Sequence, residues 1–392
     1  MLDARNRLGG RVDTRSIDPK QQLVIEMGGE WIGKSQTRIR KLCDEFGLPV
    51  INHLLAIGII KDKQYLEPGK WKFSDELEKH IKELKENQAF NLNALKGIDA
   101  WHYLSQTGIP KKDIELLDLI ESVDFGENLR FVPAQSLISN LFTGSTIESM
   151  DCETIQGGNK RLVSALAHSI GEERIQLCAE VEKIVSNHES VEVTCKDKRV
   201  FRGNALICTA PAYAITKILW SPELPKIQWN AMEALDYARI NKTAILFSTR
   251  FWKNDSFAVF SESIPHQIYH ATQNQKGEKG VLVSYATGDS ALIMAKMTKE
   301  EQAREVCMVL EKLFGNVAHY IERVENYYWG DDPYTSGAYA LFDDYTIERQ
   351  FLLAQPAENI FFAGEHTSVE YSGFMEGAIE SGQRAAREVL AQ

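Results

Sequence analysis

The sequence predicts a two-domain α/β protein, and three observations support this fold class. The chain has 392 residues, which is more than one hydrophobic core usually organises. Near the C-terminus, the apolar run Ile360–Ala363 ends in a glycine and precedes a helical pattern, as in a buried parallel strand followed by a helix. A second apolar run, Ala205–Ala210, ends at Pro211 and is expected to be another buried strand.

Composition and charge exclude several classes of protein. The net charge of −11 argues against a nucleic-acid partner. There is no apolar stretch of about 18 residues, so no membrane span is predicted. The six cysteines are scattered and the nine histidines form no ligand pair, which predicts a reducing, cytoplasmic compartment and no metal site. The sequence does not determine the oligomeric state, and we allow for a homodimer.

The first residues combine an acid, arginines and glycines at close spacing. Asp3 is followed by Arg5, then by Gly10 and Arg11. In a dinucleotide-binding βαβ unit, an acid at the end of the second strand binds the ribose hydroxyls, and glycines beside an arginine let the chain approach a diphosphate. A basic turn without a ligand is the alternative explanation of this segment.

The C-terminal helix is expected to begin near Ser372 and Gly373 and to carry one apolar face. A strand that ends in Gly364 and leads to such a helix would place free N–H groups and a positive dipole end beside a ligand. An ordinary strand, loop and helix that close an α/β domain is the alternative explanation.

The residues from Ala363 to Ala386, AGEHTSVEYSGFMEGAIESGQRAA, resemble the closing signature of the flavin-containing amine oxidases. The N-terminal DARNRLGGR and the block Glu26–Gly33, EMGGEWIG, are similar to two further motifs of that family. The resemblance implies a Rossmann-type FAD-binding domain and a substrate domain of mixed sheet and helices. It implies a discontinuous FAD-binding domain, 1–60, 151–232 and 333–392, with the substrate domain at 61–150 and 233–332.

One part of the family pattern has no counterpart in this sequence. The family has a first strand and a G-x-G-x-x-G turn before the motif that resembles DARNRLGGR, and no G-x-G-x-x-G occurs here. We therefore expect an FAD-binding domain that lacks its first β-α unit, with a gap in its sheet. A gene start placed too late would explain this, and a degenerate FAD-free relative is the other explanation.

The resemblance also implies which residues contact FAD. Asp3 would hold the ribose, while Arg5, Gly10 and Arg11 would face the diphosphate. The remaining implied contacts, from the adenine end to the flavin ring and the C-terminal helix, are Val181, Gly28, Gly29, Trp329, Gly364, Glu365, Gly373, Phe374 and Met375. Ala338 stands where some members carry a cysteine bonded to the flavin, so FAD is expected to bind non-covalently.

Three residues match catalytic positions of the family. Lys242 matches a lysine that holds a water against flavin N5, although a lone lysine in a strand is usually solvated. Tyr339 and Phe374 match two aromatic residues that flank the substrate amine; two core aromatics are the alternative. The middle segment 61–150 is expected to be a helical layer over a pocket.

The activity implied by the resemblance is FAD-dependent oxidation of an amine C–N bond to an imine, with O2 as acceptor and H2O2 as product. Two alternatives remain open in the sequence. One is a catalytically inactive, FAD-free remnant that acts as a binding protein. The other is a related flavin amino-acid oxidase or desaturase, which would share every FAD motif and differ in the pocket.

Overall fold

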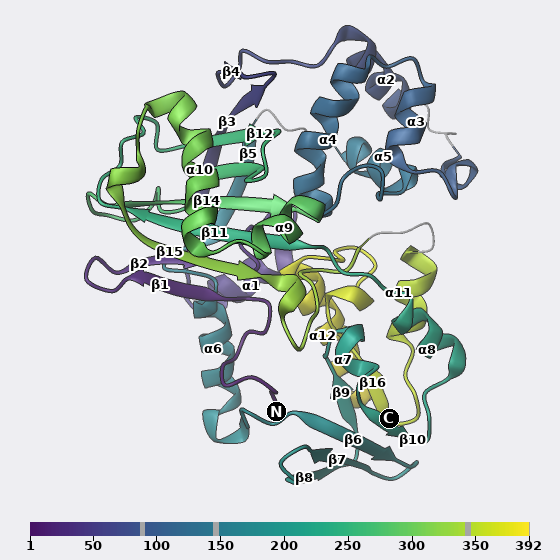
Figure 1. Cartoon of the computed structure of the whole chain (residues 1–392). Coiled ribbons are helices and arrows are strands. Elements are labelled where there is room, and N and C mark those ends of the chain that lie inside the picture. Colours follow the sequence, from purple (N-terminus) through teal and green to yellow (C-terminus); the bar gives the residue numbers. More distant parts are fainter. Residues whose placement is uncertain (87–90, 144–148, 342–345, 392) are drawn as a thin grey trace.

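The computed structural model describes residues 1–86, 91–143, 149–341 and 346–391. A large sheet with its covering helices forms one half of the molecule, and both chain termini lie in the other half (Figure 1). The combination of helices with parallel and antiparallel strands confirms the α/β fold class. Within these residues no helix is both long and apolar enough to cross a membrane.

The largest sheet has eight strands in the order β15-β11-β14-β13-β12-β3-β4, with β5 paired to β3. All of its strand pairs are antiparallel except β12 with β3. The strands are β3 (Val50–Lys61), β4 (Gln64–Leu66), β5 (Ser149–Ile155), β11 (Ile240–Phe247), β12 (Phe257–Ser261), β13 (Gln267–His270), β14 (Gly280–Thr287) and β15 (Ile321–Tyr328).

Both faces of this sheet are covered, which explains why every residue of β11 is buried. Alternate side chains of a strand point to opposite faces. Ile245 and Phe247 pack with α9 (Gly288–Ala295) and α10 (Lys299–Phe314), while Ala244 and Leu246 pack on the other face with α4 (Lys111–Phe125).

Helices from the middle of the chain cover the second face of the sheet (Figure 1). They are α2 (Asp75–Glu86), η1 (Leu92–Leu95), α3 (Ala100–Gln106), α4 and α5 (Ala134–Thr143). The predicted helical layer is therefore present, but it begins later than expected. Strand β3 continues to Lys61 and β4 follows it, because residues 61–66 form a hairpin whose turn places Asp62 and Lys63 at positive φ.

The other half of the molecule combines short sheets with several helices. A four-stranded sheet has the order β10-β6-β7-β8, β1 pairs with β2, and β9 pairs with β16. The strands are β1 (Thr14–Asp18), β2 (Leu23–Glu26), β6 (Val181–Ser186), β7 (Val191–Cys195), β8 (Val200–Gly203), β9 (Leu206–Cys208), β10 (Leu219–Ser221) and β16 (Ile360–Phe362). The helices are α1 (Thr37–Glu45), α6 (Lys160–Ile170), α7 (Ala212–Ile215), α8 (Lys226–Glu233), α11 (Thr346–Ala354) and α12 (Met375–Leu390).

Strands β9 and β16 are parallel and adjacent, although more than 150 residues separate them in the chain. β16 is fully buried, as predicted. The expected buried strand at 205–211 is shorter than predicted, and Ile207 of β9 is 39% exposed. The side chain of Ile207 is exposed because it lines a cavity rather than packing against a further strand.

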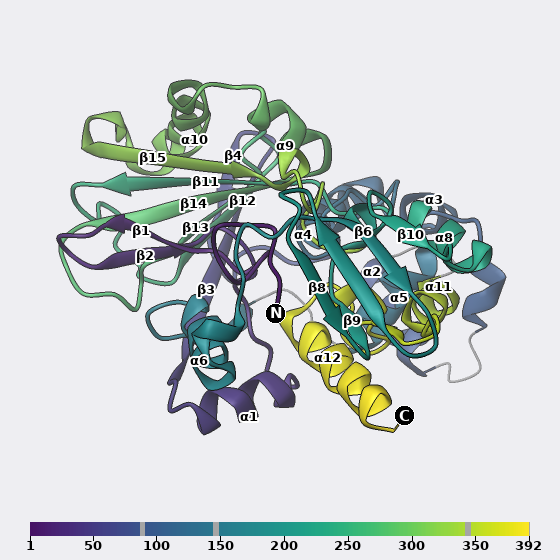
Figure 2. The ribbon, with the colours of Figure 1, turned by 90° about the horizontal axis from the view of Figure 1, so that it is seen from below.

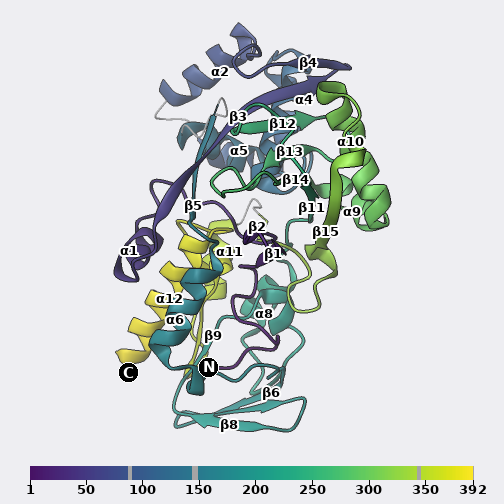
Figure 3. The same ribbon diagram turned by 90° about the vertical axis from the view of Figure 1, so that its left-hand side faces the viewer.

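The pairing of the N-terminus agrees with the predicted gap in the parallel sheet. Leu2 forms an isolated parallel bridge with Gln176, whereas β16 pairs with β9 and, locally, with Ala357. Among the described residues, no strand joins these two parts. The first residues lie between α6 and β9 in all three views of the ribbon (Figures 1, 2 and 3).

The predicted domain boundaries divide the eight-stranded sheet at two places. The boundary at 60/61 falls just before the end of β3, and the boundary at 150/151 lies within β5. The assignment of 1–60, 151–232 and 333–392 to one domain stays a prediction.

We expect replacement of Ile245 by alanine to destabilise the protein by about 2–5 kcal/mol, because it leaves a cavity in the core between the sheet and helices α9 and α10. Ile245 is fully buried, whereas Ile227 is 64% exposed and makes the same substitution a matched control. Urea unfolding of Ile245→Ala and Ile227→Ala measures the difference. Equal stabilities for the two variants would contradict the packing described here.

Candidate active site

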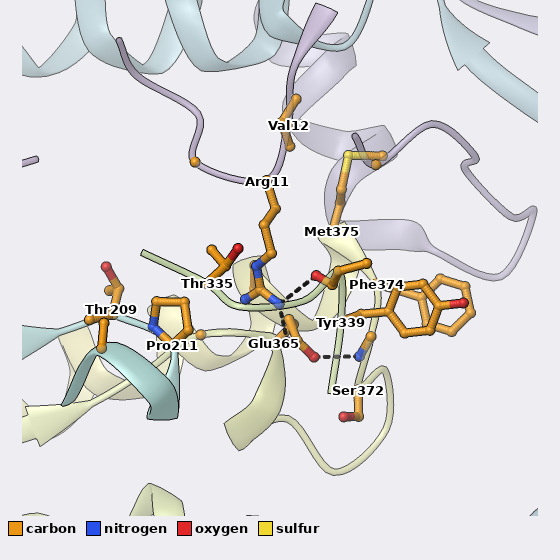
Figure 4. Close-up of a pocket in the computed structure, with 18 of the residues that line it drawn as sticks. Arg11, Val12, Thr209, Pro211, Thr335, Tyr339, Glu365, Ser372, Phe374 and Met375 are labelled. Carbon is orange, nitrogen blue, oxygen red and sulfur yellow. Dashed lines mark hydrogen bonds and ion pairs between the residues drawn. The ribbon is translucent and has the colours of Figure 1, made fainter. Parts of the chain in front are cut away.

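A cavity of about 2540 Å³ lies between the two halves of the molecule. Its walls come from the N-terminal segment, the turn after β2, the edge of β9, the strand β11 and the start of α12. Figure 4 shows part of it, with Arg11, Tyr339, Glu365 and Phe374 converging. The structure brings every predicted site residue to this cavity: Asp3, Arg5, Gly10, Arg11, Gly28, Gly29, Val181, Lys242, Trp329, Tyr339, Gly364, Glu365, Gly373, Phe374 and Met375.

Two ion pairs join the N-terminal segment to the C-terminal part of the chain. Arg5 forms a bidentate pair with Asp332, with N–O distances of 2.8 and 2.7 Å. Burial alone would raise the pKa of Asp332, but hydrogen bonds from Arg5 and Tyr327 lower it to about 2. The carboxylate therefore stays ionised and holds Arg5 beside the cavity.

Arg11 is held by Glu365 in the same way. Its Nη1 donates to Glu365 Oε1 at 2.5 Å and to the carbonyl oxygen of Ala338 at 2.9 Å. Burial raises the pKa of Glu365, but the charge and hydrogen bond of Arg11, together with His366 and the N–H of Gly373, outweigh it and the net shift is downward. Glu365 Oε2 also accepts a bond from the N–H of Gly373 at 2.7 Å, so it links Arg11 to the start of α12 (Figure 4).

Lys242 is buried at the floor of the cavity, with 3% exposure. Its Nζ donates to Glu30 Oε2 at 2.7 Å and to the carbonyl oxygens of Glu26 and Gly28 at 3.1 Å each. An ammonium group has three donors, and these three acceptors use all of them. A water held by Lys242, as predicted, would have to replace one of these acceptors, and that role stays a prediction.

Glu30 was not predicted from the sequence. Its Oε2 also accepts a hydrogen bond from the hydroxyl of Tyr269 at 2.5 Å, and Glu30 is 6% exposed. A buried ammonium requires an acidic partner, because an unpaired charge in the protein interior is very costly. The apolar residues on both sides of Lys242 were the available signal, because a buried lysine would have directed attention to the acid inside the glycine block.

The glycine turn allows the chain to pass very close to the N-terminal segment. An added Cβ on Gly28 would lie 1.9 Å from the carbonyl oxygen of Arg11. The N–H of Gly29 donates to that same oxygen at 2.9 Å. Trp329 donates to the carbonyl oxygen of Met27 at 2.8 Å, which fixes the turn from the other side.

The N-terminus of α12 opens into the cavity. The helix begins at Met375 rather than near Ser372, because Gly373 has a φ of 84°, which an α-helix does not accept. No side chain caps this end of the helix. Its free N–H groups and positive dipole end are therefore available to an electron-rich group in the cavity.

Tyr339 and Phe374 both point into the part of the cavity in front of α12 (Figure 4). The ring of Tyr339 packs against Gly373, and its hydroxyl donates to the carbonyl oxygens of Val123 and Asp124 at 3.3 and 3.2 Å. Phe374 is 49% exposed, as a residue facing a cavity can be. Their role as a pair that flanks an amine stays a prediction.

Comparison with known proteins agrees with this geometry. The family model for flavin-containing amine oxidoreductases matches residues 1–390. The chain belongs to this family. Amine oxidase B of Mus musculus is 25% identical over 434 residues, covering all of this chain and 81% of the mouse protein. Amine oxidase B of Homo sapiens is 23% identical over 439 residues, with 100% and 81% covered.

Solved structures of this fold superpose closely on the chain. Putrescine oxidase, in a wild-type structure bound to putrescine, has a TM-score of 0.86 at 21% identity and covers 100% of this chain and 93% of its own. Cyclohexylamine oxidase from Brevibacterium oxydans IH-35A has a TM-score of 0.87 at 19% identity, with 100% and 92% covered. The chain is thus a flavin-dependent amine oxidase of the oxidoreductase class, and FAD is its cofactor.

The residues present fit the flavin end of FAD. Gly28 and Gly29 present only backbone to the cavity, and the uncapped start of α12 offers N–H groups to an electron-rich ring system. Arg5 and Arg11 stand beside the Gly9–Gly10 turn, which has positive φ at both glycines. Among the described residues, this turn and the two arginines would bind the diphosphate of FAD.

Replacement of Gly28 by alanine is expected to displace the glycine turn and to cost about 1–3 kcal/mol, because the new methyl group overlaps the Arg11 carbonyl. Gly382 lies in α12 with no atom within 4 Å of an added Cβ, so Gly382→Ala is the matched control. Thermal unfolding and FAD retention through gel filtration measure the effect. A Gly28→Ala protein that is as stable and as yellow as wild type would refute the close approach.

Glu26 predicts a pH dependence of stability. Burial raises its pKa from 4.5 to about 7, although the N–H of Asn159 and the hydroxyl of Thr14 bond to its carboxyl group. Between these two pH values the unfolded chain is ionised at Glu26 and the folded protein is protonated. The free energy of unfolding should therefore fall by about 3 kcal/mol as the pH rises through this window.

Glu26→Gln cannot ionise and should lose this part of the pH dependence. Urea unfolding of wild type and variant between about pH 5 and pH 8 measures it. The difference between the two free energies of unfolding should change as the pH rises from about 5 to about 7, by most of the amount given, and stay constant above about pH 7. Curves that stay parallel over the whole range would contradict the assignment.

Proposed function

We propose that this protein oxidises the C–N bond of an amine to an imine at the cavity in front of α12. Non-covalently bound FAD takes up the electrons, and O2 is the final acceptor, giving H2O2. The observation that carries the proposal is that Tyr339 and Phe374 face the uncapped start of α12 within the cavity lined by the predicted cofactor residues.

In this proposal the chain holds FAD along the cavity. Asp3 and the turn with Arg5, Gly10 and Arg11 bind the ribose and diphosphate, and the backbone of Val181 lies at the adenine. Gly28, Gly29, Trp329 and the start of α12 surround the flavin. When bound, FAD supplies the hydride acceptor, flavin N5. Ala338 has no nucleophile, which supports non-covalent binding.

The protein's own residues prepare the amine. The reacting nitrogen must be neutral, because a protonated nitrogen has no lone pair to assist the loss of hydride. Tyr339 and Phe374 orient the nitrogen between their rings and exclude water, which disfavours its charged form. The N–H groups at the start of α12 stabilise negative charge that develops on the flavin side of the cavity. Lys242 fixes the Gly28 turn through its three hydrogen bonds.

An amine substrate fits the cavity better than an amino acid does. Recognition of a substrate carboxylate requires a cation. Two lysines line the cavity together with Tyr339, and both already have acidic partners: Lys242 pairs with Glu30, and Lys96 pairs with Glu348. The free cysteines support the proposal of a reducing, cytoplasmic compartment. We include a homodimer in this proposal because homodimers are the commonest oligomers of soluble proteins.

Purification with added FAD tests the proposal directly. A flavin absorption spectrum that survives gel filtration, and that bleaches when an amine is added without oxygen, is the expected result. A protein that binds FAD but is not bleached by any simple amine would remove amine oxidation from consideration. A colourless protein would leave the binding role of an FAD-free relative.

Replacement of Tyr339 by alanine should lower kcat/KM by about tenfold to a hundredfold and leave FAD bound, because the ring orients the amine and does not hold the cofactor. Tyr339→Phe keeps the ring and should retain most of the activity. Tyr65→Ala, outside the cavity, serves as the matched control. The measurement is steady-state oxidation with flavin content determined for each variant. An active Tyr339→Ala enzyme would exclude the aromatic pair from catalysis.

A further inference from the structure

The last turn of α4 ends at the cavity, next to the aromatic pair. Asp124 lies on the cavity wall, and its carbonyl oxygen and that of Val123 accept the hydroxyl of Tyr339 at 3.2 and 3.3 Å. The hydroxyl is the far end of the Tyr339 side chain. Asp124 is therefore located beyond the ring, at the end of the cavity away from the Tyr339 backbone.

Asp124 and its neighbour Glu121 place two acidic side chains in the last turns of α4. Glu121 is 1% exposed, one helical turn before Asp124, and accepts the Asn140 amide at 2.8 Å. In the described part of the chain, neither acid forms an ion pair with lysine or arginine. Asp124 is accessible from the cavity, yet burial in the surrounding protein raises its pKa, and burial with the charge of Asp124 raises the pKa of Glu121.

Further groups on the same cavity favour a ligand that donates hydrogen bonds. Gln350 is 4% exposed and lines the cavity, and its Oε1 has no hydrogen-bond partner among the described residues. A buried acceptor without a donor is costly, and a ligand N–H would satisfy it. The carbonyl end of α4 carries the negative end of the helix dipole, and the rings of Tyr285 and Tyr339 face a cation favourably.

We propose that Asp124 binds the second, protonated amino group of a diamine whose first amino group lies between Tyr339 and Phe374. This assignment rests on the proposed function and names its substrate class. The reacting amine must be neutral, whereas a carboxylate in a water-poor site stabilises a positive charge. Asp124 is thus suited to the amino group that does not react, and it is a specificity-determining residue.

Binding can be measured without turnover. With the flavin reduced by dithionite under nitrogen, an amine has no oxidised flavin to react with, and calorimetry reports its affinity. The probes are straight-chain diamines of four to eight carbons, each compared with the monoamine of the same length. We expect at least one diamine to bind about tenfold or more tightly than its monoamine, the value for one charge-assisted hydrogen bond.

Variants assign the preference to Asp124. Asp124→Asn should reduce the ratio of the two affinities to about one and leave monoamine binding unchanged, and Asp124→Glu should restore part of the ratio. Glu115→Gln is the same change on the same helix outside the cavity and should leave the ratio as it is. Equal affinities in wild type at every length, or a ratio that survives Asp124→Asn, would overturn the assignment.

Oxidation assays separate this inference from the function on which it rests. If monoamines and diamines bleach the flavin equally well, amine oxidation stands and the role of Asp124 falls. If neither class bleaches the flavin, the proposed function fails, and the role of Asp124 as a substrate residue fails with it. The ratio of diamine to monoamine affinity in wild type is measured without any variant. It therefore tests the assignment even if the Asp124→Asn protein folds poorly.

Discussion

The buried ammonium of Lys242 is the group on which the rest of the site depends. It projects from β11 of the eight-stranded sheet and binds the turn that follows β2, so it joins the two halves of the molecule at the cavity floor. Such a charge is tolerated only where every donor has an acceptor. Glu30 and two backbone carbonyls meet that condition, and in doing so they fix the position of Gly28.

Two further ion pairs extend this arrangement along the cavity. Arg5 with Asp332, and Arg11 with Glu365, each join residues more than 300 positions apart. Because Glu365 also binds the N–H of Gly373, Arg11 and the start of α12 are held in one network. The site is therefore assembled from both ends of the chain, and its wall is set by buried charges rather than by one continuous motif.

At the other end of the cavity the charges are not balanced. Among the residues that the structure describes, Asp124 and Glu121 form no ion pair with lysine or arginine, in contrast to every acid just named. Ionisable groups with perturbed pKa values cluster at functional sites, which makes these two acids candidates for contact with a ligand. In the proposed binding mode, the ion-paired floor lies at the neutral, reacting amine, and the acids of α4 lie at the charged amine.

The sequence by itself determined the family, the α/β class and the residues that meet at the cavity, because these are local patterns of glycine, arginine and small residues at fixed spacing. It also indicated the buried strand β16 and the helix after it. The tertiary structure alone decided that Lys242 has Glu30 as its partner and that Asp124 faces Tyr339. Each of these contacts joins residues about 210 positions apart, and no local pattern specifies which distant side chains meet. Ile207 is a further case in which the sequence was not sufficient. It lies in an apolar run that predicts burial, but its exposure depends on which element lies beside β9.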